Sequence, residues 1–231
     1  LRAIFTHGAN VLCCTPTYAL RLAEVAKEEG IDLAKSPVRT IVVAGEPGGS
    51  IPATRARLEE AWPRAKVFDH HGMTEVGPVT HQCPAQAGVL HVLEEAYLPE
   101  IIHPKTTEPV AAGGTGELVL TTLGRHGSPL IRYRTGDIVP AAELPCLCGR
   151  NDLALQGGIL GRADDMVVVR GVNVYPSAVE EILRSAGGVA EYRVRISRDD
   201  ALVEMSVEVE PDGEDDNGLP KRLARPNRRQ I

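Results

Sequence analysis

The sequence predicts an α/β fold with an attached antiparallel β unit, followed by a small α+β unit. Strand and helix patterns alternate over residues 10–69, and short strand patterns separated by turn residues follow over residues 88–133. A helix pattern and two strand patterns then occupy residues 176–210. Alternating strands and helices with short links are typical of a parallel sheet, whereas successive short strands indicate antiparallel pairing.

The first part of the chain has recognisable boundary signals. The strand pattern of residues 10–14 runs into Thr15, a typical helix N-cap, and a proline follows at the first helical position. After the strand pattern of residues 38–44, we expect Ser50 to cap the next helix. A third strand pattern occupies residues 66–69. These elements predict a parallel sheet with helices in its connections.

Polar loops follow the second and third of these strands, at residues 45–49 and 70–77. In parallel sheets, ligands bind at the carboxyl ends of the strands, so we expect both loops at one binding edge. A third polar segment, residues 132–137, is expected as a tip after a strand at residues 130–133.

A polar junction at residues 161–165 contains a glycine, an arginine and two adjacent acids. The apolar run of residues 166–169 is long enough for one buried strand, and a glycine-broken turn is expected over residues 170–175. A helix is then expected from Pro176, with Glu180 and Glu181 in its first turn, where the helix dipole favours acids.

The composition excludes several classes of partner. The net charge is −6, and the basic residues near the C-terminal end are the one basic run, so nucleic acid is not expected. No apolar run approaches the roughly 20 residues that cross a bilayer, so no membrane partner is expected. Five cysteines, an odd number, indicate thiols or metal ligands in a reducing, cytoplasmic setting. The chain begins at Leu1 without methionine or signal peptide, and we expect it to be a fragment.

Three cysteines and a histidine form a candidate structural zinc site. Cys146 and Cys148 are separated by one residue, a spacing that makes a strained disulfide. Cys83 and His91 complete a Cys₃His set, which binds Zn²⁺ tetrahedrally. His81 is an alternative ligand to His91, and four unrelated residues are the alternative to a site.

The ordered series of motifs resembles the adenylate-forming (acyl-CoA synthetase) superfamily, and most of all the phenylacetate–CoA ligase family. The motifs are VAGEP, HGMTEVGP, GELVLTTL, SPLIRYRTGD, CLCGR and GRADDMVVVRGVNVYPSAVEEIL. The resemblance implies that the fold is part of an AMP-binding large domain followed by a truncated C-terminal lid domain. It divides the chain into residues 1–161, residues 162–211 and a tail of residues 212–231 that is expected to be disordered.

The resemblance also implies an activity. A carboxylic acid, expected to be aromatic, reacts with ATP to give an acyl-adenylate and pyrophosphate, and the CoA thiolate then attacks the activated carbonyl. The implied cofactors are ATP or AMP, Mg²⁺ and CoA, with structural Zn²⁺. A homodimer is left open.

The same resemblance implies roles for individual residues. Glu75 would help to hold Mg²⁺, and the Thr74 hydroxyl would bind the α-phosphate. Asp137 would accept both ribose hydroxyls, because a carboxylate is a natural bidentate acceptor for a diol. Arg162 would reach the ribose or the phosphate.

Further positions follow from the resemblance. The adenine wall would be formed by Gly45, Glu46 and Pro47, with His71 and Gly72 also at the nucleotide. His71 stands where the family more often has tyrosine. Asp164 would be the hinge about which the lid rotates, and Gly171 would line the path of pantetheine.

The chain also departs from the family. The superfamily's early phosphate loop is not present, and no catalytic lysine is identified, because the family pattern is expected to end after about Pro211. Two other functions therefore stay open: an adenylation enzyme that loads a carrier protein, and a non-catalytic, zinc-stabilised remnant.

Overall fold

The structure is a computed structural model that describes residues 1–142, 146–169, 172–199 and 202–211. The chain divides into two compact units, Leu1–Asp165 and Met166–Ile231, and each has buried apolar side chains of its own. The predicted disorder of residues 212–231 concerns a segment outside the described residues.

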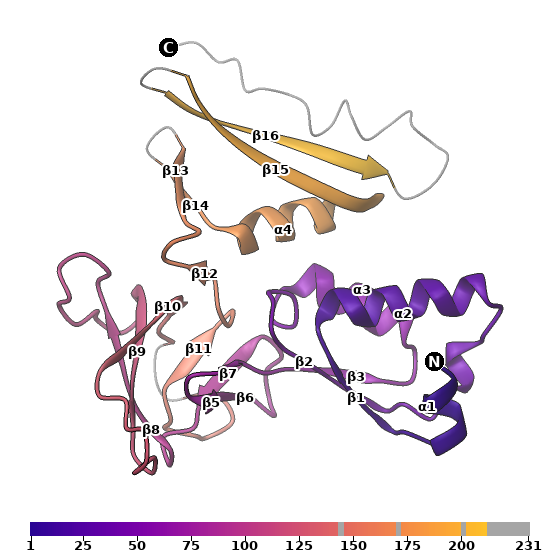
Figure 1. Ribbon diagram of the computed structural model, residues 1–231, viewed down its shortest axis with the longest axis horizontal. Coiled ribbons are helices and arrows are strands. Elements are labelled where there is room, and N and C mark those ends of the chain that lie inside the picture. The colour runs from indigo at the N-terminus through magenta and orange to yellow at the C-terminus, as the bar shows by residue number, and fades with distance from the viewer. Residues whose placement is uncertain (143–145, 170–171, 200–201, 212–231) are drawn as a thin grey trace. The chain divides into compact units, whose positions relative to one another are not determined.

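A parallel three-stranded sheet in the order β1-β2-β3 opens the first unit, as the sequence predicted. In Figure 1, the two longer helices of this region lie side by side on one face of the sheet. The elements are α1 (Arg2–His7), β1 (Val11–Cys14), α2 (Pro16–Glu28), the short 3₁₀ helix η1 (Leu33–Lys35), β2 (Thr40–Val43), α3 (Pro52–Ala61) and β3 (Lys66–Asp69).

Local signals explain where α2 begins and ends. The Thr15 hydroxyl accepts a hydrogen bond from the Tyr18 backbone N–H at 3.3 Å, so the predicted N-cap is confirmed. At the other end, Gly30 has φ +66°, a left-handed conformation that stops the helix without steric cost. The buried indole of Trp62 donates to the Ala19 carbonyl at 3.1 Å and ties α2 to the end of α3.

The prediction that Ser50 caps α3 is wrong. The residue before α3 is Ile51, which provides no side-chain cap. The Ser50 hydroxyl instead donates a hydrogen bond to the carboxylate of Asp69, the last residue of β3. The hydroxyl that the local pattern predicted as a helix cap is therefore bonded to a carboxylate from a strand later in the chain.

The rest of the first unit is antiparallel, as expected. Its described strands form a four-stranded sheet in the order β12-β10-β9-β8, a three-stranded sheet in the order β11-β7-β6 and the hairpin β4–β5. The strands are β4 (Gly72–Met73), β5 (Gly77–Pro78), β6 (Thr80–Gln82), β7 (Val89–Val92), β8 (Tyr97–Ile102), β9 (Thr115–Thr122), β10 (Tyr133–Pro140), β11 (Ala154–Gln156) and β12 (Gly161–Arg162).

One strand of this region begins later than predicted. The strand expected at residues 130–133 is instead β10, which runs from Tyr133 to Pro140. Thr135, Gly136 and Asp137 therefore lie inside a strand and not at a tip beyond its end. A β-bulge at this point makes room for them, and it is the feature that shapes the candidate site.

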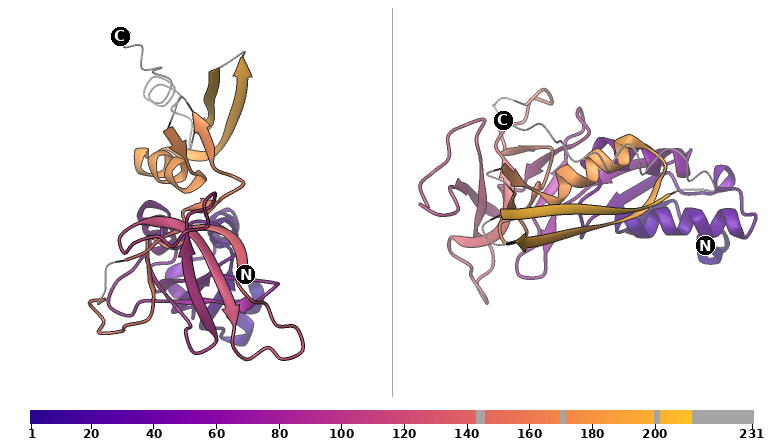
Figure 2. Two further views of the ribbon diagram at one scale, coloured as in Figure 1. Left: turned by 90° about the vertical axis from the view of Figure 1, so that its left-hand side faces the viewer. Right: turned by 90° about the horizontal axis from the view of Figure 1, so that it is seen from above.

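The second unit contains β13 (Val167–Val169), β14 (Val172–Val174), α4 (Pro176–Ala186), β15 (Val189–Asp199) and β16 (Leu202–Pro211). Figure 2 shows the long antiparallel hairpin of β15 and β16, and α4 contacts β15. Val179 and Leu183 form the buried face of α4.

Two local predictions in this unit are wrong. Part of the expected turn after β13 is strand β14, and β13 is not buried, because Val168 is 47% exposed. Glu180 lies beyond the first turn of α4. Its carboxylate accepts hydrogen bonds from Arg184 and from the Tyr192 hydroxyl, so its role is to hold α4 to β15. Among the helices that the structure describes, none has the length and apolar character needed to cross a membrane.

Candidate functional site

The loop after β2 begins with Gly45, which has φ +91°, a conformation that favours glycine. Glu46 then turns back toward α2, and its Oε1 atom accepts a hydrogen bond from the Thr17 backbone N–H at 2.6 Å. A carboxylate at a helix N-terminus is favoured by the helix dipole. The side chain of Glu46 is therefore engaged with the N-terminal end of α2.

The turn after β3 is held by β6. The His71 backbone N–H donates to the Thr80 hydroxyl at 2.9 Å, and His70 Nδ1 lies 2.8 Å from the Thr80 carbonyl oxygen. The Asp69 backbone N–H donates to Gln82 Oε1 at 3.0 Å. Burial raises the pKa of the Asp69 carboxyl, and hydrogen bonds from Ser50 and His70 partly oppose this effect. Thus His71 projects from a fixed backbone.

Thr74 and Glu75 lie in the turn between β4 and β5, and both are exposed. Gly72 lies so close to the facing strand that an added Cβ would come 2.8 Å from the Gly77 carbonyl oxygen. Arg125 donates a hydrogen bond to the Glu75 carbonyl. The hydroxyl and the carboxylate are consequently presented to solvent by a tight hairpin that a second loop supports.

Asp137 lies on β10 opposite Arg162 on β12. One of its oxygens, Oδ2, lies 3.2 Å from His71 Nε2, and the other, Oδ1, lies 3.5 Å from Arg162 Nη1. The side chain of Asp137 is only 8% exposed and that of His71 only 13%. Residues from three separate loops and strands therefore meet at one carboxylate.

The contact between His71 and Asp137 is close, but its angles do not fit a hydrogen bond. Both His71 Nε2 and Asp137 Oδ2 are buried and have no hydrogen-bond partner. A buried polar atom without a partner is costly, so native proteins rarely keep one without a reason. A ligand hydroxyl group could donate a hydrogen bond to Asp137 Oδ2 and accept one from His71 Nε2. The two side chains are therefore suited to bind a ligand that carries hydroxyl groups.

Arg162 lies between two acids. Its Nε atom donates to Asp164 Oδ1 at 3.0 Å, and its Nη1 atom donates to the Thr135 carbonyl at 3.3 Å. Burial lowers the pKa of the Arg162 guanidinium, but the neighbouring acids together, Asp164 before Asp137, raise that pKa above its ordinary value. Asp164 itself is exposed and lies next to the last residue of the first unit.

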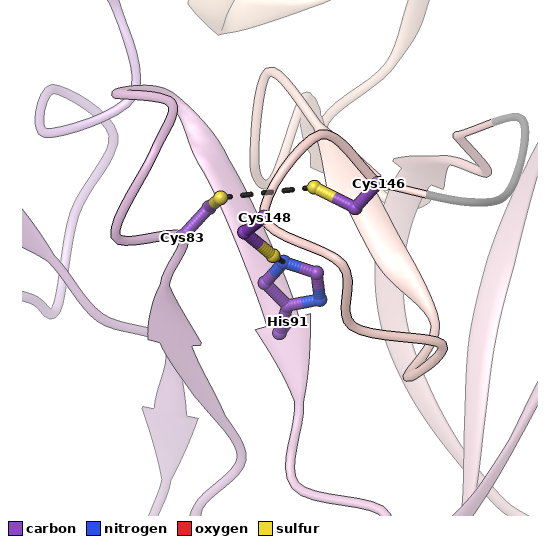
Figure 3. Close-up of side chains that lie close together, drawn as sticks. All are labelled: Cys83, His91, Cys146 and Cys148. Atoms are coloured by element: carbon purple, nitrogen blue, oxygen red, sulfur yellow. Dashed lines mark hydrogen bonds between the residues drawn. The ribbon is translucent and has the colours of Figure 1, made fainter.

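The four residues of the candidate metal centre converge (Figure 3). Their ligand atoms all lie within 4.8 Å of one another. Cys83 Sγ is 3.7 Å from Cys146 Sγ, and Cys148 Sγ is 3.3 Å from His91 Nε2. Tetrahedral Zn²⁺ with Zn–S of about 2.3 Å and Zn–N of about 2.0 Å requires S···S and S···N distances of roughly 3.8 and 3.5 Å. The residues present therefore fit a zinc ion.

The surroundings of the cluster also suit a metal. His91 Nδ1 lies 3.4 Å from the Asp152 carbonyl oxygen, a second contact that would orient the imidazole. The alternative ligand, His81, stacks on His91 with ring centroids 5.6 Å apart and is not part of the cluster. All five cysteines of the chain are free thiols.

One predicted residue lies outside the described structure, and two residues near the site had no predicted role. Gly171 lies outside the described residues. Glu117, a buried carboxylate beside the bulge of β10, belongs to the GELVLTTL motif, but no role was assigned to it from the sequence, although a glutamate within the apolar run of β9 is an unusual residue there. Thr80, which fixes the His71 turn, gave no signal, because a threonine in a short strand is ordinary.

Comparison with known proteins gave matches to two family models. One, described as an AMP-binding enzyme, matches residues 1–124. The other, described as an AMP-binding enzyme C-terminal domain, matches residues 171–226. The second match continues past Pro211, the point at which we expected the family pattern to end.

Curated relatives and solved structures are also similar. The phenylacetate-coenzyme A ligase of Thermus thermophilus is 37% identical over 204 residues, which cover 87% of this chain and 45% of the relative. That of Escherichia coli is 34% identical, with the same shares. The structure of 2-hydroxyisobutyryl-CoA ligase in the postadenylation state, in complex with 2-HIB-AMP, matches 91% of this chain and 45% of its own with a TM-score of 0.84 and 33% identity. The chain thus spans about half the length of the curated relatives it matches.

Proposed function

We propose, because the chain belongs to the AMP-binding enzyme family, that it forms the adenylate-binding part of a ligase that joins a carboxylic acid to CoA. In this reaction, a carboxylate oxygen attacks the α-phosphorus of ATP and pyrophosphate leaves. The CoA thiolate then attacks the carbonyl carbon of the acyl-adenylate, and AMP leaves. The similarity to phenylacetate-coenzyme A ligases and to 2-hydroxyisobutyryl-CoA ligase supports this class of substrate.

The observation that carries the proposal is the buried, unpartnered carboxylate oxygen of Asp137 beside the unpartnered His71 nitrogen. Ribose offers two adjacent hydroxyl groups, and a carboxylate can accept from both. The donor that Asp137 lacks would be supplied by the ribose, while His71 Nε2 would meet a second polar atom of the nucleotide. Arg162, 3.5 Å from the same carboxylate, would reach the ribose or the phosphate.

Other residues take the remaining roles in the proposal. Gly45, Glu46 and Pro47 would form the adenine wall through their backbone, because the side chain of Glu46 is engaged with α2. Thr74 would donate its exposed hydroxyl to the α-phosphate. Glu75, an exposed carboxylate, suits Mg²⁺, which is usually held by one or two carboxylates together with substrate phosphates. Mg²⁺ would neutralise phosphate charge when bound.

The domain arrangement is part of the same proposal. Residues 1–161 would form the large domain and residues 162–211 the lid, with Asp164 as the hinge and Gly171 on the path of pantetheine. We further propose an aromatic acid as substrate and a cytoplasmic location.

We also propose that Cys83, His91, Cys146 and Cys148 hold a structural Zn²⁺ ion. Four protein ligands close the coordination shell, so such an ion would have no open position for chemistry. Its task would be to hold the loop of Cys146 and Cys148 against β6 and β7.

The test is calorimetric titration of the folded chain with AMP. Asp137→Asn keeps the shape of the side chain but removes its charge, and we expect affinity to fall roughly ten- to a hundredfold, the value of a hydrogen bond to a charged group. Asp32→Asn, at an exposed acid that caps η1, is the control and should bind as the wild type does. Circular dichroism establishes that each variant is folded. A folded wild type that does not bind AMP would favour a non-catalytic remnant.

A further inference from the structure

Glu117 is a buried carboxylate that none of the roles above uses. It lies in the middle of the four-stranded sheet on β9, and its side chain is only 3% exposed. Burying a carboxylate is costly unless its oxygens are paired and hydrogen-bonded. Arg134 meets this need in part, because its Nε atom donates to Oε1 at 3.1 Å and to Oε2 at 3.0 Å, and its Nη2 atom also donates to Oε2.

The remaining contact of Glu117 is to the β-bulge that contains Asp137. Arg134 pairs with Val119 and Ile138 pairs with Glu117, so that residues 135–137 stand opposite Leu118 alone. Such a bulge takes backbone groups out of the strand ladder. The Gly136 N–H donates to Glu117 Oε1 at 3.2 Å.

Thr135 satisfies the next backbone group of the bulge. Its hydroxyl accepts from the Asp137 N–H at 3.0 Å and donates to the Leu118 carbonyl at 2.8 Å. The two successive N–H groups of Gly136 and Asp137 therefore both bind side chains, one from across the sheet and one from within the bulge. Together these bonds fix the backbone from which the Asp137 carboxylate projects.

We infer that Glu117 is a positioning residue for nucleotide binding: its carboxylate holds the bulge in the one shape that aims Asp137 at the ribose. The inference rests on the proposed function, since it deepens the role of Asp137. Without the acceptor at Glu117, the half-buried Gly136 N–H loses its partner and the bulge relaxes. Asp137 would then remain in the sequence but lose its alignment with the two hydroxyl groups.

A ratio of affinities separates positioning from general stability. We define the ribose preference as the affinity for AMP divided by the affinity for 2′,3′-dideoxy-AMP, both measured by calorimetry on folded protein. For the wild type we expect a ribose preference of roughly ten or more, because the lost hydroxyl groups bind a carboxylate. A residue that only stabilises the fold would lower the melting temperature and leave this ratio unchanged.

We expect Glu117→Leu and Glu117→Met, which both lack an oxygen acceptor for the Gly136 N–H, to lower the ribose preference at least threefold. Glu117→Met keeps the length of the side chain, so it serves if Glu117→Leu does not fold. The control is Glu100→Gln on β8, because Glu100, a more exposed acid, forms an ion pair with Arg132 at 3.0 Å away from the bulge. This variant should keep the wild-type ratio.

A double variant tests the link to Asp137. If Glu117 acts through Asp137, Glu117→Leu combined with Asp137→Asn should show the same ribose preference as Asp137→Asn alone. A wild-type preference that persists in folded Glu117→Leu or folded Glu117→Met would overturn the inference and leave the proposed function standing. A wild type that binds AMP and dideoxy-AMP equally would instead overturn the role of Asp137, and the inference with it.

Discussion

Replacing Gly136 by alanine should weaken nucleotide binding beyond its effect on stability. Gly136 has φ +77° within the bulge of β10, a conformation that costs a residue with a Cβ roughly 1–2 kcal/mol. The added Cβ would also come 2.7 Å from Arg162 Nη2. That atom is the end of a flexible side chain, so the guanidinium would move and would lose its position beside Asp137 and the Thr135 carbonyl.

Gly157 provides a matched control for the backbone strain in Gly136→Ala. Gly157 has φ +88°, and an added Cβ would meet nothing within 4 Å, so Gly157→Ala introduces the same backbone strain without the collision. For a unit of this size, a loss of 1 kcal/mol lowers the melting temperature by about 2–4 °C. We therefore expect both variants to melt roughly 2–8 °C below the wild type.

Only Gly136→Ala should change binding. A hydrogen bond from a charged donor is worth about 1.5–3 kcal/mol, and displacement of Arg162 removes part of it, so we expect affinity for AMP to fall at least threefold. Thermal melting and calorimetric titration of the two variants side by side provide the assay. Equal AMP affinities in Gly136→Ala and Gly157→Ala would refute the claim that Arg162 is part of the nucleotide site.

Three further outcomes are expected. Metal analysis should find about one zinc ion per chain. The Cys148→Ser variant should lose this zinc and melt at a lower temperature, whereas Cys13→Ser, at an exposed free thiol, should keep the zinc. Zinc retained in both variants would contradict the assignment. The folded pKa of Asp69 is raised by burial above its ordinary 3.8, so the fold favours the protonated form and loses stability as pH rises from about 4 through the raised value. The side chain of Asp69→Asn stays neutral, so the melting temperature of this variant minus that of the wild type should increase as the pH rises through this range. A melting-temperature difference that stays constant with pH would contradict the reasoning. Burial, with Cys13 and Glu46 contributing, raises the pKa of Cys14 to about 11. The rate at which iodoacetamide alkylates Cys14, followed by mass spectrometry, should therefore still rise about tenfold between pH 9 and pH 10 and should not level off there.

The elements with local signals were predictable from the sequence. The proline and threonine at the start of α2 and the glycine after it fix that helix by short-range chemistry. The motif series indicated the adenylate-forming superfamily, and the match over residues 1–124 confirms it. The spacing of Cys146 and Cys148 likewise led to the cluster that the structure brings together.

The features that were missed depend on contacts between distant residues. Ser50 resembles a helix cap, but Asp69 competes for its hydroxyl from another strand. Strands β6 and β11 have three residues each, too short to show a period of two. The bulge of β10 includes a hydrogen bond from the Gly136 N–H to Glu117 on the facing strand, and no local pattern in residues 132–137 indicates that partner.

The structure of the chain with bound AMP tests the central claim most directly. We expect the ribose of AMP to lie with its two hydroxyl groups within hydrogen-bonding distance of Asp137, so that the buried Oδ2 atom gains the partner that it lacks. Arg162 should contact the ribose or the phosphate in the same complex. AMP bound away from Asp137, with that carboxylate oxygen still unpartnered, would contradict the assignment of this site.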